Sequence, residues 1–192
     1  MSHSHAHAVQ FYQDENSLFS TVGDFIAGGL ESGHPAVIIA TQAHTGPILD
    51  VLRSRSIDVD EARHDGDLVI LGASDTLALF MAEKMPNAEA FERNVGRYID
   101  QLIEARPHAV VHAYGEMVDV LWQAGQTDAA IRLEVLWNKL AAIYGFSLLC
   151  GYSMGHFYKQ PALYDEVCRQ HTQVIEAGRG AGARLKRVRT TA

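Results

Sequence analysis

Short apolar runs that alternate with longer stretches of helical periodicity are the feature that most restricts the fold of this chain. The runs lie at residues 7–12, 36–40, 68–71, 109–114 and 146–152 and are typical of strands. The run at 36–40, AVIIA, has no polar position, as expected of a central parallel strand that is covered on both faces. The pattern predicts an α/β fold, a mostly parallel sheet with helices on both faces.

Apolar stripes at helical spacing predict the helices that separate these strands. One helix is expected to open within residues 41–47, with Pro47 in its first turn, and to continue through Arg55. The other predicted helices span 17–31, 76–84, 87–105, 115–123, 127–144 and 162–176. A chain of 192 residues suits one domain, which we place at 7–176.

Residues 177–192 are rich in Gly, Arg and Thr, and we expect them to form a basic, disordered tail. The formal charge of the whole chain is −7, so the body without this basic end is strongly acidic. An acidic body repels a phosphate backbone, and we expect no nucleic-acid binding by the main domain. No apolar run is long enough to cross a bilayer and no secretory signal is visible. We therefore expect a cytoplasmic protein with no membrane partner.

Ligands of an open parallel sheet bind where the loops leave the carboxyl ends of the strands. At one such end, after the strand at 36–40, a nucleotide-binding protein would carry a phosphate-binding loop. The stretch 41–47, TQAHTGP, has one glycine, no lysine, and a proline that removes an amide donor. This degenerate phosphate loop argues against ATP binding of the usual kind. Anion binding at the start of the helix stays open.

Several residues near the strand ends have two readings. His112 and Glu116 are either ligand contacts or a buried core histidine and a helix-starting acid. Cys150 is either a small buried apolar residue or a thiol that lines a pocket. The alternating His3, His5 and His7 would share one face of a strand, and we interpret them as a source of adventitious metal affinity. We assign no metal site, and the cofactor is unknown.

Several separated segments resemble one known family. They are 7–12 (HAVQFY), 25–36 (FIAGGLESGHPA), 37–41 (VIIAT), 111–122 (VHAYGEMVDVLW), 133–140 (LEVLWNKL) and 148–152 (LLCGY). Across residues 7–176 the chain resembles the MEDS domain, the methanogen/methylotroph, DcmR-type sensory domain. The resemblance implies a RecA- or KaiC-like sheet without a phosphate loop, used in prokaryotic signal transduction and transcription regulation. Family members are proposed to sense small molecules, including simple hydrocarbon derivatives.

The resemblance also shapes the expected partners. Family members occur beside DNA-binding domains or histidine kinases, and no such output domain is visible in this chain. We expect it to act through a histidine kinase, a regulator or another signalling protein, through its tail, or as a stand-alone sensor.

The sequence thus predicts a non-catalytic sensor that binds a small molecule at the carboxyl ends of the sheet. The residues expected to contact the ligand are strand-end positions within the matching motifs: Tyr12, Thr41, His44, His112, Tyr114, Glu116, Cys150 and Tyr152. One alternative is an enzyme that uses Glu116, His112 and Cys150. Another is a structural interaction module that forms a homo-oligomer through its Trp- and Leu-bearing helices.

Overall fold

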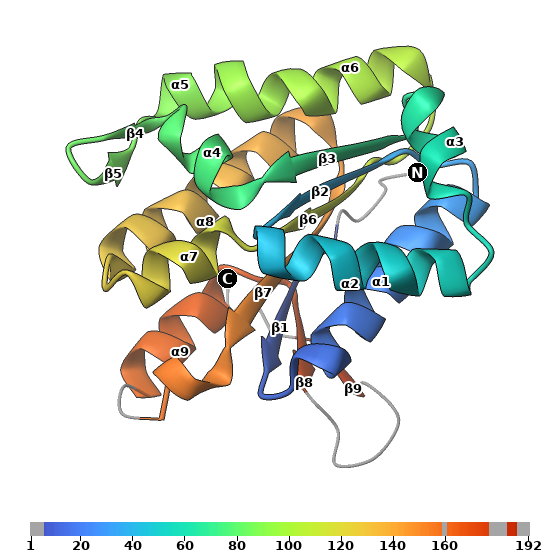
Figure 1. Cartoon of the computed structure of the whole chain (residues 1–192). Helices are drawn as coiled ribbons and strands as arrows, with labels where there is room; N and C mark the ends of the chain where they lie inside the picture. The colour runs from blue at the N-terminus through green and yellow to red at the C-terminus, as the bar shows by residue number, and fades with distance from the viewer. Residues whose placement is uncertain (1–5, 159–160, 177–183, 188–192) are drawn as a thin grey trace.

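The computed structural model describes residues 6–158, 161–176 and 184–187. They contain a seven-stranded sheet in the order β3-β2-β6-β7-β1-β8-β9 (Figure 1). All neighbouring strands are parallel except the last pair, β8 and β9. The predicted mostly parallel α/β sheet is confirmed. The strands are β1 (His7–Tyr12), β2 (Ala36–Ala40), β3 (Leu68–Gly72), β6 (His112–Gly115), β7 (Ser147–Ser153), β8 (Gln173–Glu176) and β9 (Arg184–Arg187).

Helices cover both faces of this sheet (Figure 1). One core lies under α1 (Glu15–Glu31), α2 (Gln42–Ser54) and α3 (Val59–His64). The other lies under α4 (Ala73–Ala78), α6 (Arg97–Ala105), α7 (Met117–Gln123), α8 (Thr127–Tyr144) and α9 (Pro161–Arg169). A short helix, α5 (Ala88–Phe91), continues through the π-helical turn η1 (Glu92–Gly96) into α6. Strand β2 contributes side chains to both cores. Val37 and Ile39 pack in the core under α4 and α6–α9, and Ile38 packs in the core under α1–α3.

Two of the predicted helices end earlier than the sequence indicates. The helix expected at 76–84 stops at Ala78, and a two-stranded hairpin follows, β4 (Met81–Ala82) and β5 (Met85–Pro86). Its turn residues Glu83 and Lys84 have left-handed φ values of 49° and 68°, which a helix cannot contain. The helix expected at 162–176 ends at Arg169.

The end of the chain that the structure describes also differs from the prediction. Residues 173–176 form β8, because Val174 and Ile175 are buried in opposite cores and this requires a period of two. Residues 184–187 pair with β8 as β9, so the structure gives that segment of the expected disordered tail as a strand. The rest of 177–192 lies outside the described residues.

Helix α2 begins five residues before Pro47, which therefore lies inside the helix and not in its first turn as predicted. Among the described residues, no helix is both long enough and apolar enough to cross a bilayer. A 3-10 turn, η2 (Met154–His156), follows β7.

Candidate functional site

A cavity of about 460 Å³ lies where the strands of the sheet have their carboxyl ends. We call it the strand-end cavity. The chain leaves β1 and β2 toward α1 and α2 on one face, and it leaves the intervening β6 toward α7 on the other face. A crevice forms where neighbouring strands exit to opposite faces. The lining residues are Tyr12, Gln13, Glu15, Thr41, Ala43, His44, Glu116, Asp119, Val120, Gln123 and Ser153.

Glu116, which follows β6, joins two walls of this cavity. Its buried carboxylate accepts hydrogen bonds from the Thr41 backbone N–H, from Nδ1 of His44 at 2.7 Å and from the Tyr114 hydroxyl at 3.1 Å. Thr41 is the residue that caps the start of α2, where a phosphate loop would present amides to an anion. In this chain a carboxylate of its own holds that amide, so the site already contains a negative charge.

Asp119 joins the remaining walls, and the sequence did not identify it. Its Oδ2 accepts from the Tyr12 hydroxyl at 3.1 Å and from the Gln123 amide at 2.8 Å, and its Oδ1 accepts from the Ser153 N–H at 3.0 Å. Asp119 was missed because it lies inside α7 and not directly after a strand. The available signal was its spacing of three residues from Glu116, which puts both acids on the same side of the first turn.

The cavity holds more acid than base. Three lining residues are carboxylates, Glu15, Glu116 and Asp119, against one imidazole, His44. The hydrogen bond from His44 to Glu116 raises the pKa of the imidazole above its usual value. Burial alone would raise the pKa of Glu116, but hydrogen bonds from His44 and the Thr41 amide outweigh it and lower that pKa. Both shifts favour the charged pair.

These shifts predict how the pair stabilises the fold as pH changes. His44 contributes fully below its ordinary pKa of 6.5 and loses its contribution as pH rises through the raised value. Glu116 contributes above its ordinary pKa of 4.5 and loses its contribution as pH falls below it. Urea unfolding of the wild type and of His44→Asn should therefore differ most near about pH 6, and the difference should shrink toward about pH 9. A constant difference would contradict the charged pair, and the exposed His64→Asn is the control.

The predicted residue His112 lies away from this cavity. It is the first residue of β6 and pairs with Ala36 and Ser147, which are also the first residues of their strands. Its ring packs against Phe25 of α1, with centroids 4.9 Å apart, and against His34 in the turn after α1, with centroids 5.7 Å apart. His112 is therefore at the end of the sheet where the strands begin, half-buried against α1 and away from the strand-end cavity.

Two adjacent glycines of α1 offer a test of this packing. A Cβ on Gly29 would lie 2.7 Å from the His112 ring, whereas a Cβ on Gly28 would meet nothing within 4 Å. Gly29→Ala should lower the free energy of unfolding by about 1–3 kcal/mol because the ring cannot move freely. Gly28→Ala should raise it by roughly 0.5–1 kcal/mol through helix propensity. Urea denaturation checks both, and equal effects would show that His112 is not held against α1.

The predicted residues Cys150 and Tyr152 lie under α8, on the face opposite to His112. Cys150 and Tyr152 both contact Glu134 of α8, with Sγ 3.6 Å from Oε2 and the tyrosine hydroxyl 2.9 Å from Oε1. Burial raises the pKa of the Cys150 thiol well above its usual value. Since His112 and Cys150 face different cores, the trio Glu116, His112 and Cys150 does not form one catalytic group.

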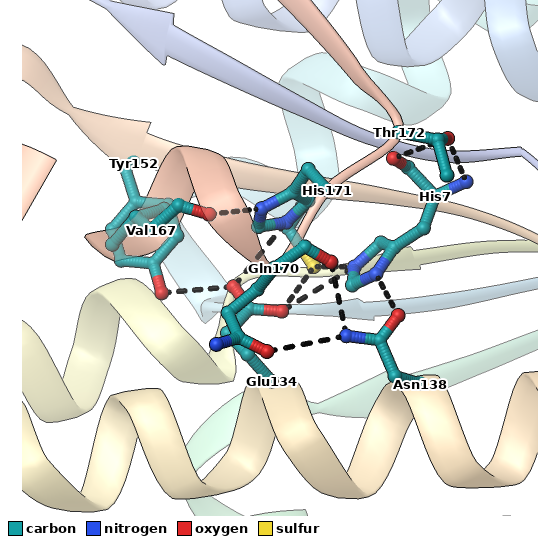
Figure 2. Close-up of polar contacts among 9 residues, drawn as sticks. His7, Glu134, Asn138, Tyr152, Val167, Gln170, His171 and Thr172 are labelled. Carbon is teal, nitrogen blue, oxygen red and sulfur yellow. Dashed lines mark hydrogen bonds and ion pairs between the residues drawn. The ribbon is translucent and has the colours of Figure 1, made fainter. Parts of the chain in front are cut away.

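Cys150 belongs to a buried cluster with His7, Glu134 and His171 (Figure 2). We call these four residues the buried cluster. Burial lowers the pKa of His171 to about 4, so its imidazole is neutral at neutral pH. His3 and His5, the other two histidines of the N-terminal run, lie outside the described residues.

The eight predicted contacts thus separate into three groups. Tyr12, Thr41, His44 and Glu116 line the strand-end cavity, and Tyr114 supports it through Glu116. His112 lies at the amino edge, and Cys150 and Tyr152 lie in the opposite core. A larger hollow of about 670 Å³ lies beside β2 and β3 and shares Thr41, but Asp75 is the charged side chain in its lining. The two carboxylates that bind other lining residues, Glu116 with His44 and Asp119 with Tyr12, are in the smaller cavity.

The sheet order and the crevice define the fold class as α/β of the RecA/KaiC-like type. The chain is similar to a KaiC-like protein from Pyrococcus horikoshii OT3, with a TM-score of 0.56, 12% identity, and coverage of 97% of this chain and 81% of that chain. It is also similar to an uncharacterized protein from Pyrococcus horikoshii, solved in complex with an unknown peptide, with a TM-score of 0.69, 12% identity, and coverage of 97% and 84%. These likenesses show the fold alone.

The search of curated proteins gives no match. The family model of MEDS, the methanogen/methylotroph, DcmR sensory domain, matches residues 6–172. The chain belongs to this family of sensory domains, and the resemblance seen in its motifs is confirmed.

Proposed function

We propose that this domain senses a small molecule that binds in the strand-end cavity and is not chemically changed there. The observation that carries the proposal is the bracing of the cavity by two carboxylates. Glu116 ties the start of α2 to β6, and Asp119 ties α7 to the ends of β1 and β7. A ligand at this point contacts all of the segments that these bonds hold together.

The lining indicates the chemistry of the ligand. Its acidic balance disfavours phosphates and other anions, because they would approach Glu15, Glu116 and Asp119. Hydrogen-bond donors such as hydroxyl or amino groups suit these acceptors. Ala43 and Val120 add apolar surface to the same lining. A short hydrocarbon derivative with a polar donor group therefore fits better than a nucleotide.

A signal arises if the ligand prefers one arrangement of the loops over another. A ligand donor that competes for Glu116 or Asp119 would release His44 or Tyr12 and change how α1, α2 and α7 meet at the edge. The partner that reads this change would be a cytoplasmic histidine kinase, a transcription regulator or a second copy of the domain.

A thermal-shift panel tests the proposal on the full chain. The panel contains short alcohols, short amines, halogenated hydrocarbons, inorganic phosphate and MgATP. At least one class of polar hydrocarbon derivative should raise Tm, since a ligand at about 100 times its Kd adds about 2.7 kcal/mol of stability. Phosphate and MgATP should not. Stabilisation together with turnover of MgATP, or no response to any organic class, would overturn the proposal.

Matched variants of two aspartates locate the binding. Asp119→Asn changes the strand-end cavity, and Asp75→Asn changes the neighbouring hollow. The Tm response to the active class should disappear in Asp119→Asn and persist in Asp75→Asn. The opposite result would move the site to the hollow beside the ends of β2 and β3.

A further inference from the structure

Four side chains with metal-binding chemistry meet in the core, and none of them lines the strand-end cavity (Figure 2). His7 begins β1, Cys150 lies in β7, Glu134 lies in α8, and His171 lies between α9 and β8. Each is at least 96% buried. One ligand atom from each lies within 4.8 Å of the others. The buried cluster is therefore a compact set of donors drawn from four separate segments.

The hydrogen bonds around the cluster define which nitrogen of each imidazole carries its proton. The Asn138 amide nitrogen donates to the Gln170 carbonyl at 2.9 Å, so the Asn138 amide oxygen is the atom that faces His7. Nδ1 of His7 must then donate to this oxygen at 2.9 Å. Nδ1 of His171 likewise donates to the Val167 carbonyl at 2.7 Å. In the neutral form of each ring, Nε2 therefore carries the lone pair, and this atom points into the cluster.

These two Nε2 atoms face other acceptors. Nε2 of His7 lies 3.3 Å from Oε2 of Glu134 and 3.5 Å from Sγ of Cys150. Nε2 of His171 lies 3.5 Å from Oε1 of Glu134, and it has no hydrogen-bond partner in the described part of the chain. The thiol offers one proton for all of these contacts. A buried set of lone pairs facing each other is unfavourable unless a cation lies among them.

We propose that His7, Glu134, Cys150 and His171 form a four-coordinate site for a divalent transition metal of the zinc class. Zinc lies about 2.0–2.3 Å from such ligands, so neighbouring donors of a tetrahedral site are about 3.3–3.7 Å apart. The donor separations of 3.3, 3.5 and 3.6 Å within the cluster fall in this interval. These three separations join His7, Cys150 and Glu134, which form one face of a tetrahedral site. His171 supplies the fourth donor within 4.8 Å of the others, and its ring moves inward when the metal binds.

The donor types select the metal. Two imidazoles and a thiolate favour Zn²⁺, Co²⁺ or Ni²⁺ and disfavour Mg²⁺ and Ca²⁺, which prefer oxygen ligands. A thiolate and a carboxylate together balance a divalent charge, so the occupied site is neutral, as a buried site requires. Asn138, the Val167 carbonyl and the Tyr152 hydroxyl hold the two imidazoles and the carboxylate in place. Such supporting bonds orient the ligands of known metal sites.

A metal bound in the cluster would have a structural role, because it would link segments that are far apart in the sequence. His7 and His171 lie at opposite ends of the domain sequence, and their rings are 4.1 Å apart. A metal bound by both would fasten β1 to the segment that enters β8, and to β7 and α8 between them. Metal binding would then add to folding stability, because the unfolded chain has no such site.

Cobalt substitution tests the site on the untagged full chain. The chain is purified with a reductant and refolded with Co²⁺, in a background of His3→Ala, His5→Ala and Cys168→Ser. Cys150 is then the sole thiol. We expect about one Co²⁺ per chain, a thiolate-to-cobalt charge-transfer band and the visible bands of a tetrahedral ion. Without metal uptake, or with uptake but no thiolate band, the cluster is a proton-sharing network and the proposal fails.

Variants separate this site from adventitious binding. Cys150→Ser should lose the charge-transfer band, whereas the exposed His64→Gln should keep it. Asn138→Ala removes the bond to His7 without removing a ligand, and it should weaken Zn²⁺ affinity about 10- to 100-fold in a competition with a chelator. Unchanged affinity in Asn138→Ala and Cys150→Ser would show that the metal binds elsewhere. If Cys150→Ser does not fold, the band in the Cys168→Ser background still decides.

Discussion

Replacing Glu116 with alanine is expected to lower the free energy of unfolding by about 3–5 kcal/mol, the range seen when one partner of a buried ion pair is removed. Glu116 is 3% exposed and accepts from the Thr41 amide, His44 and the Tyr114 hydroxyl. Alanine leaves all three donors without their acceptor and removes the buried counter-charge of the His44 imidazole. Urea denaturation monitored by far-ultraviolet circular dichroism measures the loss.

Two other substitutions show whether the stability depends on the charge of Glu116 or on the place of a carboxylate near His44. Glu15 also approaches His44, at 3.6 Å, but its side chain is 66% exposed, so Glu15→Gln should change stability by less than about 1 kcal/mol. Glu116→Gln keeps an oxygen for the Thr41 amide but turns a donor toward His44 or Tyr114. Its loss should lie between those of the other two variants. Equal stability of Glu116→Ala and the wild type would mean that Glu116 does not brace the cavity.

The periodicity of the sequence was sufficient to predict the sheet and its covering helices. A strand such as 36–40 buries every residue, and a helix such as 127–144 repeats its apolar positions at helical spacing. These signals depend on a few neighbouring residues and survive without knowledge of the tertiary structure. Residues 173–176 were assigned wrongly because their strand identity depends on pairing with β1, a contact between the two ends of the domain.

The candidate site was predictable only in part for the same reason. The rule that ligands bind beyond the strand ends found Tyr12, Thr41, His44 and Glu116. It also selected Cys150 and Tyr152, because a position along the chain does not say which face of the sheet a side chain enters.

The buried cluster was only partly predictable from the sequence. Parallel pairing sets Val9 beside Cys150, which brings His7 close to the thiol, and this register depends on the strand order. One local signal was present. Glu134 lies within the apolar stripe of α8 and is fully buried, and a buried acid at such a position requires a partner.

The second large effect is expected at Trp137, a fully buried residue of α8. Its ring makes edge-on contacts with Phe91 and Phe146, with centroids 5.1 and 6.0 Å away. It also lies against Gly115, where an added Cβ would be 3.5 Å from the indole. Trp137→Ala should lower the free energy of unfolding by about 3–5 kcal/mol through lost packing and the cavity left behind.

The control for Trp137 lies on the same helix. Ile143 is 62% exposed, so Ile143→Ala should change stability by no more than about 0.5 kcal/mol. Trp137→Phe should lose less than Trp137→Ala, because the indole N–H has no partner in the described part of the chain and packing alone is reduced. Circular dichroism must follow the unfolding, since the substitution removes a tryptophan. Similar losses for Trp137→Ala and Ile143→Ala would mean that α8 does not pack on β6 through this ring. Because Gly115 directly precedes Glu116, α8 would then contribute no support to the carboxylate that braces the cavity.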